Sequence, residues 1–114
     1  MATLTAQQIT QAGLEPTTVT PAVAGDKLAN TAIQFFHVVN GGGVAMTATV
    51  IPVVTTVIDP TLGVLKKENA VLSLAAGEEG FLGPFEVDAF NDVNGNITIT
   101  CSAQTSIKLS ALYL

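Results

Sequence analysis

Arginine and tryptophan are absent from this chain of 114 residues, which has one cysteine, one histidine and one tyrosine. Its only cationic side chains are Lys27, Lys66, Lys67 and Lys108, and its formal net charge is -5 at pH 7. Binding to nucleic-acid phosphates or to anionic membranes requires clustered lysine or arginine. We therefore expect neither a nucleic-acid partner nor a membrane partner.

The single cysteine and the single histidine limit redox and metal chemistry. One cysteine excludes an intrachain disulfide, and Cys101 lies in an alternating apolar and polar run that predicts a buried position. One cysteine and one histidine do not suffice for a structural zinc site within one chain. We therefore predict no metal-binding and no cofactor-binding residues.

His37 is the one candidate for a catalytic base. It lies between Phe36 and Val38 in a predicted strand. A triad base needs a nucleophile, and no G-x-S-x-G elbow accompanies it. The sequence favours a structural histidine, packed or at a partner interface, so we predict no catalytic residue and no enzyme activity.

Carboxylates occur in two close pairs, Glu78 with Glu79 and Glu86 with Asp88. Paired carboxylates carry out glycoside hydrolysis, but that chemistry also needs a sugar cleft, which aromatic residues normally line. Aromatic residues make up only 5% of the chain. We therefore predict that these pairs lie in solvated turns.

A second polar cluster has oxygen-bearing side chains suited to a cation. It lacks the spacing and terminal glutamate of a helix-flanked calcium loop. The pattern predicts a surface turn, and it leaves open a weak calcium site across a subunit contact. Its members are Asp88, Asn91, Asp92, Asn94 and Asn96.

Three further patterns carry no chemistry. Asn40–Gly43 resembles a phosphate loop but lacks a following helix and a Lys-Ser/Thr end, so it predicts a turn. Asn96-Ile97-Thr98 is a glycosylation triplet only in a secreted protein. The first ten residues lack the basic and apolar regions of a secretory signal. No apolar run reaches 18 residues, so we predict no transmembrane helix. From the missing secretory signal and the single cysteine we expect synthesis in the cytoplasm.

The composition that is present favours a small globular domain. Hydrophobic residues make up 48% of the chain and charged residues 11%, against about 25% charged in ordinary soluble domains. The length predicts one domain with a real core. A surface with so few charges is poorly protected against association. We interpret it as a surface meant to be covered by partners.

The order of patterns predicts an all-β fold. Thr5 and Gln8 match a capping box and predict a short helix over residues 6–12. Beyond it, apolar and β-branched runs alternate with turns, and Asn40–Gly43 predicts a hairpin between its flanking strands. Pro52 and Pro84 predict edge strands that could accept another strand. Strands are predicted at 33–39, 44–51, 53–58, 70–74, 81–87, 97–102 and 104–114, with 62–67 as strand or loop.

We therefore predict an antiparallel β-sandwich or a jelly-roll-like barrel of about seven or eight strands, with one short N-terminal helix. Residues 1–20 are predicted to form an N-terminal arm that contains the helix. Residues 21–114 are predicted to form the single sandwich domain.

The chain resembles small bacteriophage proteins that decorate or cement the head. The resemblance runs in order across most of the chain, and no single element is specific. The elements are Gln8–Pro16, Gly25–Asn30, Phe35–Gly42, Ala75–Glu78, Leu82–Phe85 and Ser102–Leu114. The family has no catalytic motif, so no active-site residues are transferred to this chain. This chain departs from the family by having no arginine, which argues against contacts that are rich in salt bridges.

The resemblance implies a β-sandwich that clusters, often as a homotrimer, on the outer surface of an assembled capsid and bridges major capsid protein subunits. Two alternatives remain. One is another virion part, such as a head–tail adaptor, a tail component or a fibre base. The other is a soluble ligand-binding or adhesion module, which would need an aromatic cleft, whereas the five phenylalanines are predicted to lie in the core.

Overall fold

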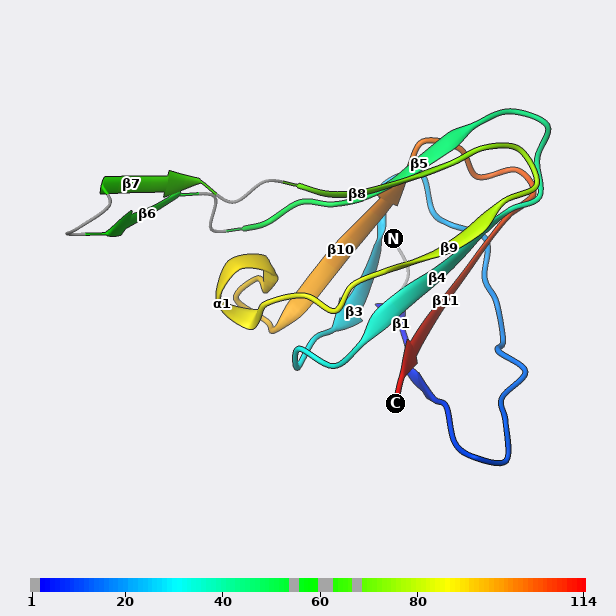
Figure 1. The fold of residues 1–114 in the computed structure, drawn as a ribbon, viewed down its shortest axis with the longest axis horizontal. Helices are drawn as coiled ribbons and strands as arrows, with labels where there is room; N and C mark the ends of the chain where they lie inside the picture. The colour runs from blue at the N-terminus through cyan, green and yellow to red at the C-terminus, as the bar shows by residue number, and fades with distance from the viewer. Residues whose placement is uncertain (1–2, 54–55, 60–62, 67–68) are drawn as a thin grey trace.

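The fold consists almost entirely of β-strands. A computed structural model describes residues 3–53, 56–59, 63–66 and 69–114, with 56–59 and 63–66 described by their backbone alone (Figure 1). The all-β prediction is confirmed. The strands are β1 Thr3–Leu4, β2 Gln7–Gln8, β3 Asp26–Ala29, β4 Phe35–Asn40, β5 Met46–Val50, β6 Thr56–Asp59, β7 Gly63–Lys66, β8 Ala70–Leu74, β9 Glu79–Leu82, β10 Asn96–Cys101 and β11 Ile107–Tyr113.

Two sheets share one core. One sheet, called sheet A, has the order β1-β3-β10-β5-β8, and the other, called sheet B, has the order β2-β11-β4-β9. Alternate residues of each strand point inward, as the period of a strand requires. Phe36, Val38 and Leu109 of sheet B join Ile97 and Ile99 of sheet A in one apolar cluster. Burying a side chain of this size contributes about 1.5–3 kcal/mol, so this cluster is the main stabilising feature.

The predicted helix over residues 6–12 is wrong. Two short strands occupy the start of the chain, β1 parallel to β3 and β2 parallel to β11. Leu4 is buried in the core, and the Gln7 side chain exchanges two hydrogen bonds of 2.9 Å with the main chain of Thr17. One turn of helix is costly to nucleate, and pairing with two existing sheets outweighs a local cap. The two parallel pairs also make the sheets mixed rather than purely antiparallel.

The one helical turn among the described residues is α1, Val87–Phe90, which follows β9. The prediction of a strand that continues to Val87 is therefore wrong beyond Leu82. Gly83 and Pro84 end the strand, since proline cannot donate to a ladder and Gly83 has a φ of 120°.

The predicted hairpin around Asn40–Gly43 is also wrong, because β4 and β5 belong to different sheets. β4 pairs with β11 and β9, while β5 pairs with β10 and β8. The buried Asn40 amide fixes this crossing by donating to the carbonyl oxygens of Val44 (2.9 Å) and Leu74 (3.3 Å), and its Oδ1 accepts from the Gly42 N–H (3.1 Å). The sequence signal identifies a turn but not the sheet to which the chain continues.

The sequence predicts edge strands at Pro52 and at Pro84, and the structure agrees only at Pro84. β5 is internal in sheet A, and Pro52 beyond it is buried, so the prediction of an edge at Pro52 is wrong. Pro84 does follow an edge strand, because β9 is the outermost strand of sheet B. β8 is the corresponding outer strand of sheet A.

β6 and β7 form a separate antiparallel hairpin, seen at the left of Figure 1 away from the two larger sheets. Its strands overlap the predicted strand at 53–58 and the segment at 62–67 that is predicted as strand or loop. Residues 54, 55, 62 and 67 of those predictions lie outside the described residues.

Candidate interaction surface

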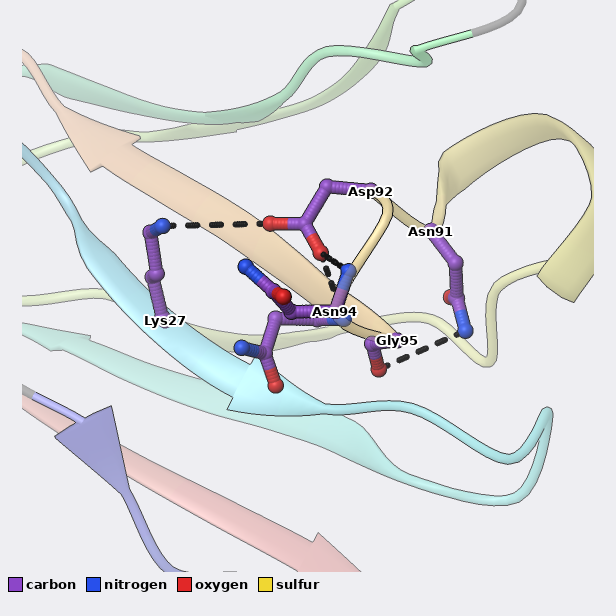
Figure 2. Close-up of polar contacts among 6 residues, drawn as sticks. Lys27, Asn91, Asp92, Asn94 and Gly95 are labelled. Atoms are coloured by element: carbon purple, nitrogen blue, oxygen red, sulfur yellow. Dashed lines mark hydrogen bonds and ion pairs between the residues drawn. The ribbon is translucent and has the colours of Figure 1, made fainter.

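The loop between α1 and β10 contains the polar cluster that the sequence singles out. The Asp92 carboxylate accepts hydrogen bonds from the main-chain N–H groups of Asn94 (2.8 Å) and Asn96 (3.0 Å). Figure 2 shows the Asp92 carboxylate between Asn94 and Lys27, and Lys27 Nζ lies 3.8 Å from Asp92 Oδ2. The two N–H donors, foremost that of Asn96, and the Lys27 charge hold the pKa of Asp92 below its usual range. The predicted turn is confirmed, because one carboxylate closes it.

Asn91 fastens this loop to the end of β3. Its amide nitrogen donates to the Asn30 carbonyl oxygen (2.9 Å), and its Oδ1 accepts from the Asn30 amide (2.6 Å). The Asn30 amide also donates to the carbonyl oxygen of Phe85 (3.1 Å). The loop therefore uses these polar groups to hold the fold together. Asp88 is exposed on α1, apart from this network.

No metal-binding group of three or more His, Cys, Asp or Glu side chains occurs within the part of the chain that the structure describes. Likewise, none of the described helices is long and apolar enough to cross a membrane.

Cys101 is buried in sheet A, as predicted. Burial, followed by the negative charge of Asp26, raises the pKa of its thiol to about 11. The thiolate is the nucleophilic form of cysteine, so this environment makes Cys101 inert near neutral pH.

The two carboxylate pairs do not converge on a site. Glu78 closes the turn before β9 by accepting a hydrogen bond from the Ala75 N–H (2.8 Å). Glu79 projects from β9 toward His37, and Glu86 and Asp88 are exposed around α1. Asn96 and Thr98 of the glycosylation triplet lie in β10, half-buried in sheet A.

His37 lies on the outer face of sheet B, not in the core. Its ring stacks on that of Phe81 at 4.8 Å between centroids and 25° between planes. Its Nε2 lies 3.6 Å from a carboxylate oxygen of Glu79, and Ser110 is its neighbour across the ladder on β11. A serine, histidine and glutamate are thus adjacent on three strands.

This trio lacks the geometry of a triad. A nucleophilic serine must be accessible and hydrogen-bonded to its base. The Oγ of Ser110 is buried and has no hydrogen-bond partner among the described residues. The arrangement gives His37 a packing role, which is one of the two roles that the sequence favours.

Phe81 is the centre of an apolar surface on sheet B. This residue is 61% exposed, although the sequence predicts all five phenylalanines in the core; that prediction is wrong for Phe81 and for the half-buried Phe35, and right for Phe36, Phe85 and Phe90. Phe35 meets Phe81 edge to face at 5.8 Å, and Glu79 is exposed beside it. We call Phe35, His37, Glu79 and Phe81 the Phe81 face.

A shallow apolar depression continues this face past Phe35. Its volume is about 420 Å³, and Gly83 and Pro84 form one wall. Ile33 and Leu114, which also line it, are exposed. The Phe81 face and this depression therefore form a continuous apolar surface at the edge of sheet B. The remaining lining residue is Ala32.

The neighbours of Phe81 in β9 explain why it faces outward. Gly80 and Leu82 flank Phe81 in β9, and Leu82 is buried while Gly80 lies against Leu72 of β8. Strand alternation therefore places Phe81 outward.

Comparison with known proteins gives no relative. No family model matches the chain, and neither a curated protein nor a solved structure is similar to it at a significant level.

Proposed function

We propose that this chain is a virion structural protein that binds the outer surface of an assembled bacteriophage capsid and stabilises contacts between major capsid protein subunits. In this proposal it has no enzymatic activity and takes no cofactor. It is made in the host cytoplasm and self-associates, as a trimer, on the capsid. In this proposal its two sheets form a β-sandwich or a jelly-roll-like barrel.

The observation that carries the proposal is the exposed apolar surface on a chain that has few charges. Single exposed apolar residues are ordinary, but a continuous patch is typical of a protein contact. The Phe81 face continues into the depression beside Gly83 and Pro84, and Ile33 and Leu114 extend it. A partner that covers this surface removes it from water.

The physical logic of a cement protein fits such a surface. A protein that binds only the expanded capsid shifts the equilibrium toward that state, by an amount set by its differential affinity. Many copies act together, so each contact can be modest. Apolar contacts can provide this affinity without the salt bridges that a chain free of arginine forms poorly.

The test is binding of the purified protein to purified heads of its own phage, before and after expansion. We expect saturable binding to expanded heads only, and DNA release at a higher temperature. The variant Phe81→Lys should weaken binding. Val93→Lys is the matched control, because Val93 is 99% exposed and lies in the Asp92 loop, away from the Phe81 face.

Binding to no form of the head, with the protein recovered in tails or rings, would overturn the proposal in favour of a tail component or head–tail adaptor. These two placements also differ in symmetry, since rings of six or twelve copies are typical of tails and connectors.

A further inference from the structure

We propose that β9 is a docking edge that accepts an extended, antiparallel strand from a partner chain, in which one face carries two apolar residues and then, toward the C-terminus, a basic residue. This inference rests on the proposed function to the extent that the partner there is a capsid subunit. Its physical basis is independent of the partner's identity.

The first observation is the direction of the main-chain groups of β9. In an antiparallel ladder, hydrogen-bonded pairs alternate with pairs that are not hydrogen-bonded. Asn40 N–H donates to the Glu78 carbonyl oxygen at 2.8 Å, which fixes the phase of the ladder between β4 and β9. The N–H and C=O groups of Glu79 and Phe81 consequently point away from β4.

The second observation is that β9 pairs with β4 alone among the strands the structure describes. An edge of this kind is a template for another strand. Its neighbour β8 contacts it through side chains, since Leu72 lies against Gly80, but no ladder joins the two strands. The main-chain groups of Glu79 and Phe81 that point away from β4 therefore have no ladder partner among the described strands.

The third observation is the order of acidic and apolar groups along the outer face of this edge. Glu79, whose side chain is 66% exposed, comes first and Phe81 second. The apolar depression beside Gly83 and Pro84 comes third. Directly opposite residues of an added strand fall on the same face, so it would place a basic residue opposite Glu79 and apolar residues opposite the other two.

Charge around the edge favours the same partner. Glu78, Glu86 and Asp88 are exposed at the two ends of the segment, and no basic residue occurs in the sequence between Lys67 and Lys108. Lys108 lies two strands from Glu79, beyond Val39. An acidic edge attracts a basic strand and repels an acidic one, which also disfavours pairing between two copies of this edge.

The outer strand of sheet A provides a matched control. The Thr47 N–H donates to Ser102 Oγ (2.8 Å), and the Thr47 carbonyl oxygen accepts from the Ser102 N–H (2.8 Å). Both main-chain groups of Thr47 therefore point away from β8. The same alternation then leaves the Val71 N–H pointing outward from β8, and Val71 is 54% exposed. Val71 thus matches Phe81 in exposure and main-chain direction, without an acidic neighbour of the kind that Glu79 provides.

The experiment titrates the full chain into two fluorescein-labelled peptides, acetyl-VTVTKT-amide and its charge-reversed control acetyl-VTVTET-amide, and follows anisotropy. We expect saturable binding of the lysine peptide that weakens with salt, and binding at least about tenfold weaker for the glutamate peptide. Phe81→Pro removes an outward N–H and the aromatic ring, and should weaken binding by about tenfold or more. Val71→Pro should leave the dissociation constant within about twofold.

Amide hydrogen exchange on the unmodified chain gives a second readout that does not depend on the folding of a variant. The lysine peptide should protect the amides of Glu79 and Phe81 and leave those of Val71 and Ser73 unchanged. Absence of saturable binding, or equal protection at both edges, would overturn the docking proposal, even if the protein binds expanded heads. Peptide binding without head binding would instead support the docking edge and overturn the proposed function.

Discussion

The loop around Asp92 and the Phe81 face differ in how their side chains are used. Polar side chains bind within the fold in the loop, whereas aromatic side chains are exposed to solvent on the Phe81 face. The loop is rich in polar side chains, and they close on one another and on the main chain. The Phe81 face is rich in aromatic carbon, and much of it is open to solvent. The polar cluster therefore holds the fold together, whereas the apolar Phe81 lies exposed at the surface.

The largest expected effect comes from breaking the hydrogen bonds by which Asn30 holds Asn91 and Phe85. Asn30→Ala removes the donors to Phe85 and Asn91, and it leaves the Phe85 carbonyl oxygen without this partner in a buried position. We expect a loss of about 2–4 kcal/mol in the free energy of unfolding, measured by urea denaturation at pH 7. Asn94→Ala, at an exposed position of the same loop, should change it by less than about 0.5 kcal/mol. Equal losses would show that the hydrogen bonds of Asn30 have no special role in stability.

A second change probes the wall of the apolar depression. A Cβ on Gly83 would lie 2.8 Å from the Phe85 ring and 3.1 Å from the Phe35 Cβ, at a φ of 120°. Gly83→Ala should therefore cost about 2–3 kcal/mol.

The comparison residue for Gly83 is Gly95, which also has a positive φ of 78° but has open space where a Cβ would lie. Gly95→Ala should cost only the backbone strain of about 1–2 kcal/mol. Thermal unfolding of both variants measures the difference. A larger loss at Gly95 would contradict the assignment of crowding to Gly83.

A pH-dependent effect sharpens the account of Asp92. The pKa of Asp92 is lowered in the fold, so its contribution to stability is present above its unfolded value of about 3.9 and is lost as the pH falls through the lower folded value. Asp92→Asn should therefore be less stable than the parent chain at pH 7. The difference should shrink below about pH 4. Urea denaturation across pH measures it, and a difference independent of pH would contradict a role for the charge.

The smallest expected effect on folding is at the Phe81 face. Phe81→Ser loses the stacking on His37 but little burial, so the free energy of unfolding should change by less than about 1 kcal/mol. The same variant should weaken binding to expanded heads. A large loss of stability in calorimetry would mean that Phe81 serves the fold rather than a partner.

Much of the strand content was predictable from local patterns. The alternation of Ile97, Ile99 and Cys101 with polar residues identified β10 and its buried face correctly. The Asx turn was predictable as well, because Asp92 and its backbone donors are close in sequence. The wrong predictions concern long-range choices. Gln7 pairs with a strand more than 100 residues away, and no local cap could show this.

The candidate surface depended on tertiary structure even more. Phe36 and Phe81 are both phenylalanines in strands, yet one is fully buried and the other is largely exposed. Strand alternation limits each side chain to one of two faces, but only the packing of the sheets decides which face is covered.

The sequence by itself determined the β class, the turn at Asp92 and the scarcity of charge, because these follow from residue types and short-range spacing. The tertiary structure decided that β4 and β5 separate into two sheets, that β9 becomes an edge, and that Phe81 lies outside the core. The physical reason is that strand pairing depends on the balance of many distant contacts, whose energies no local pattern contains.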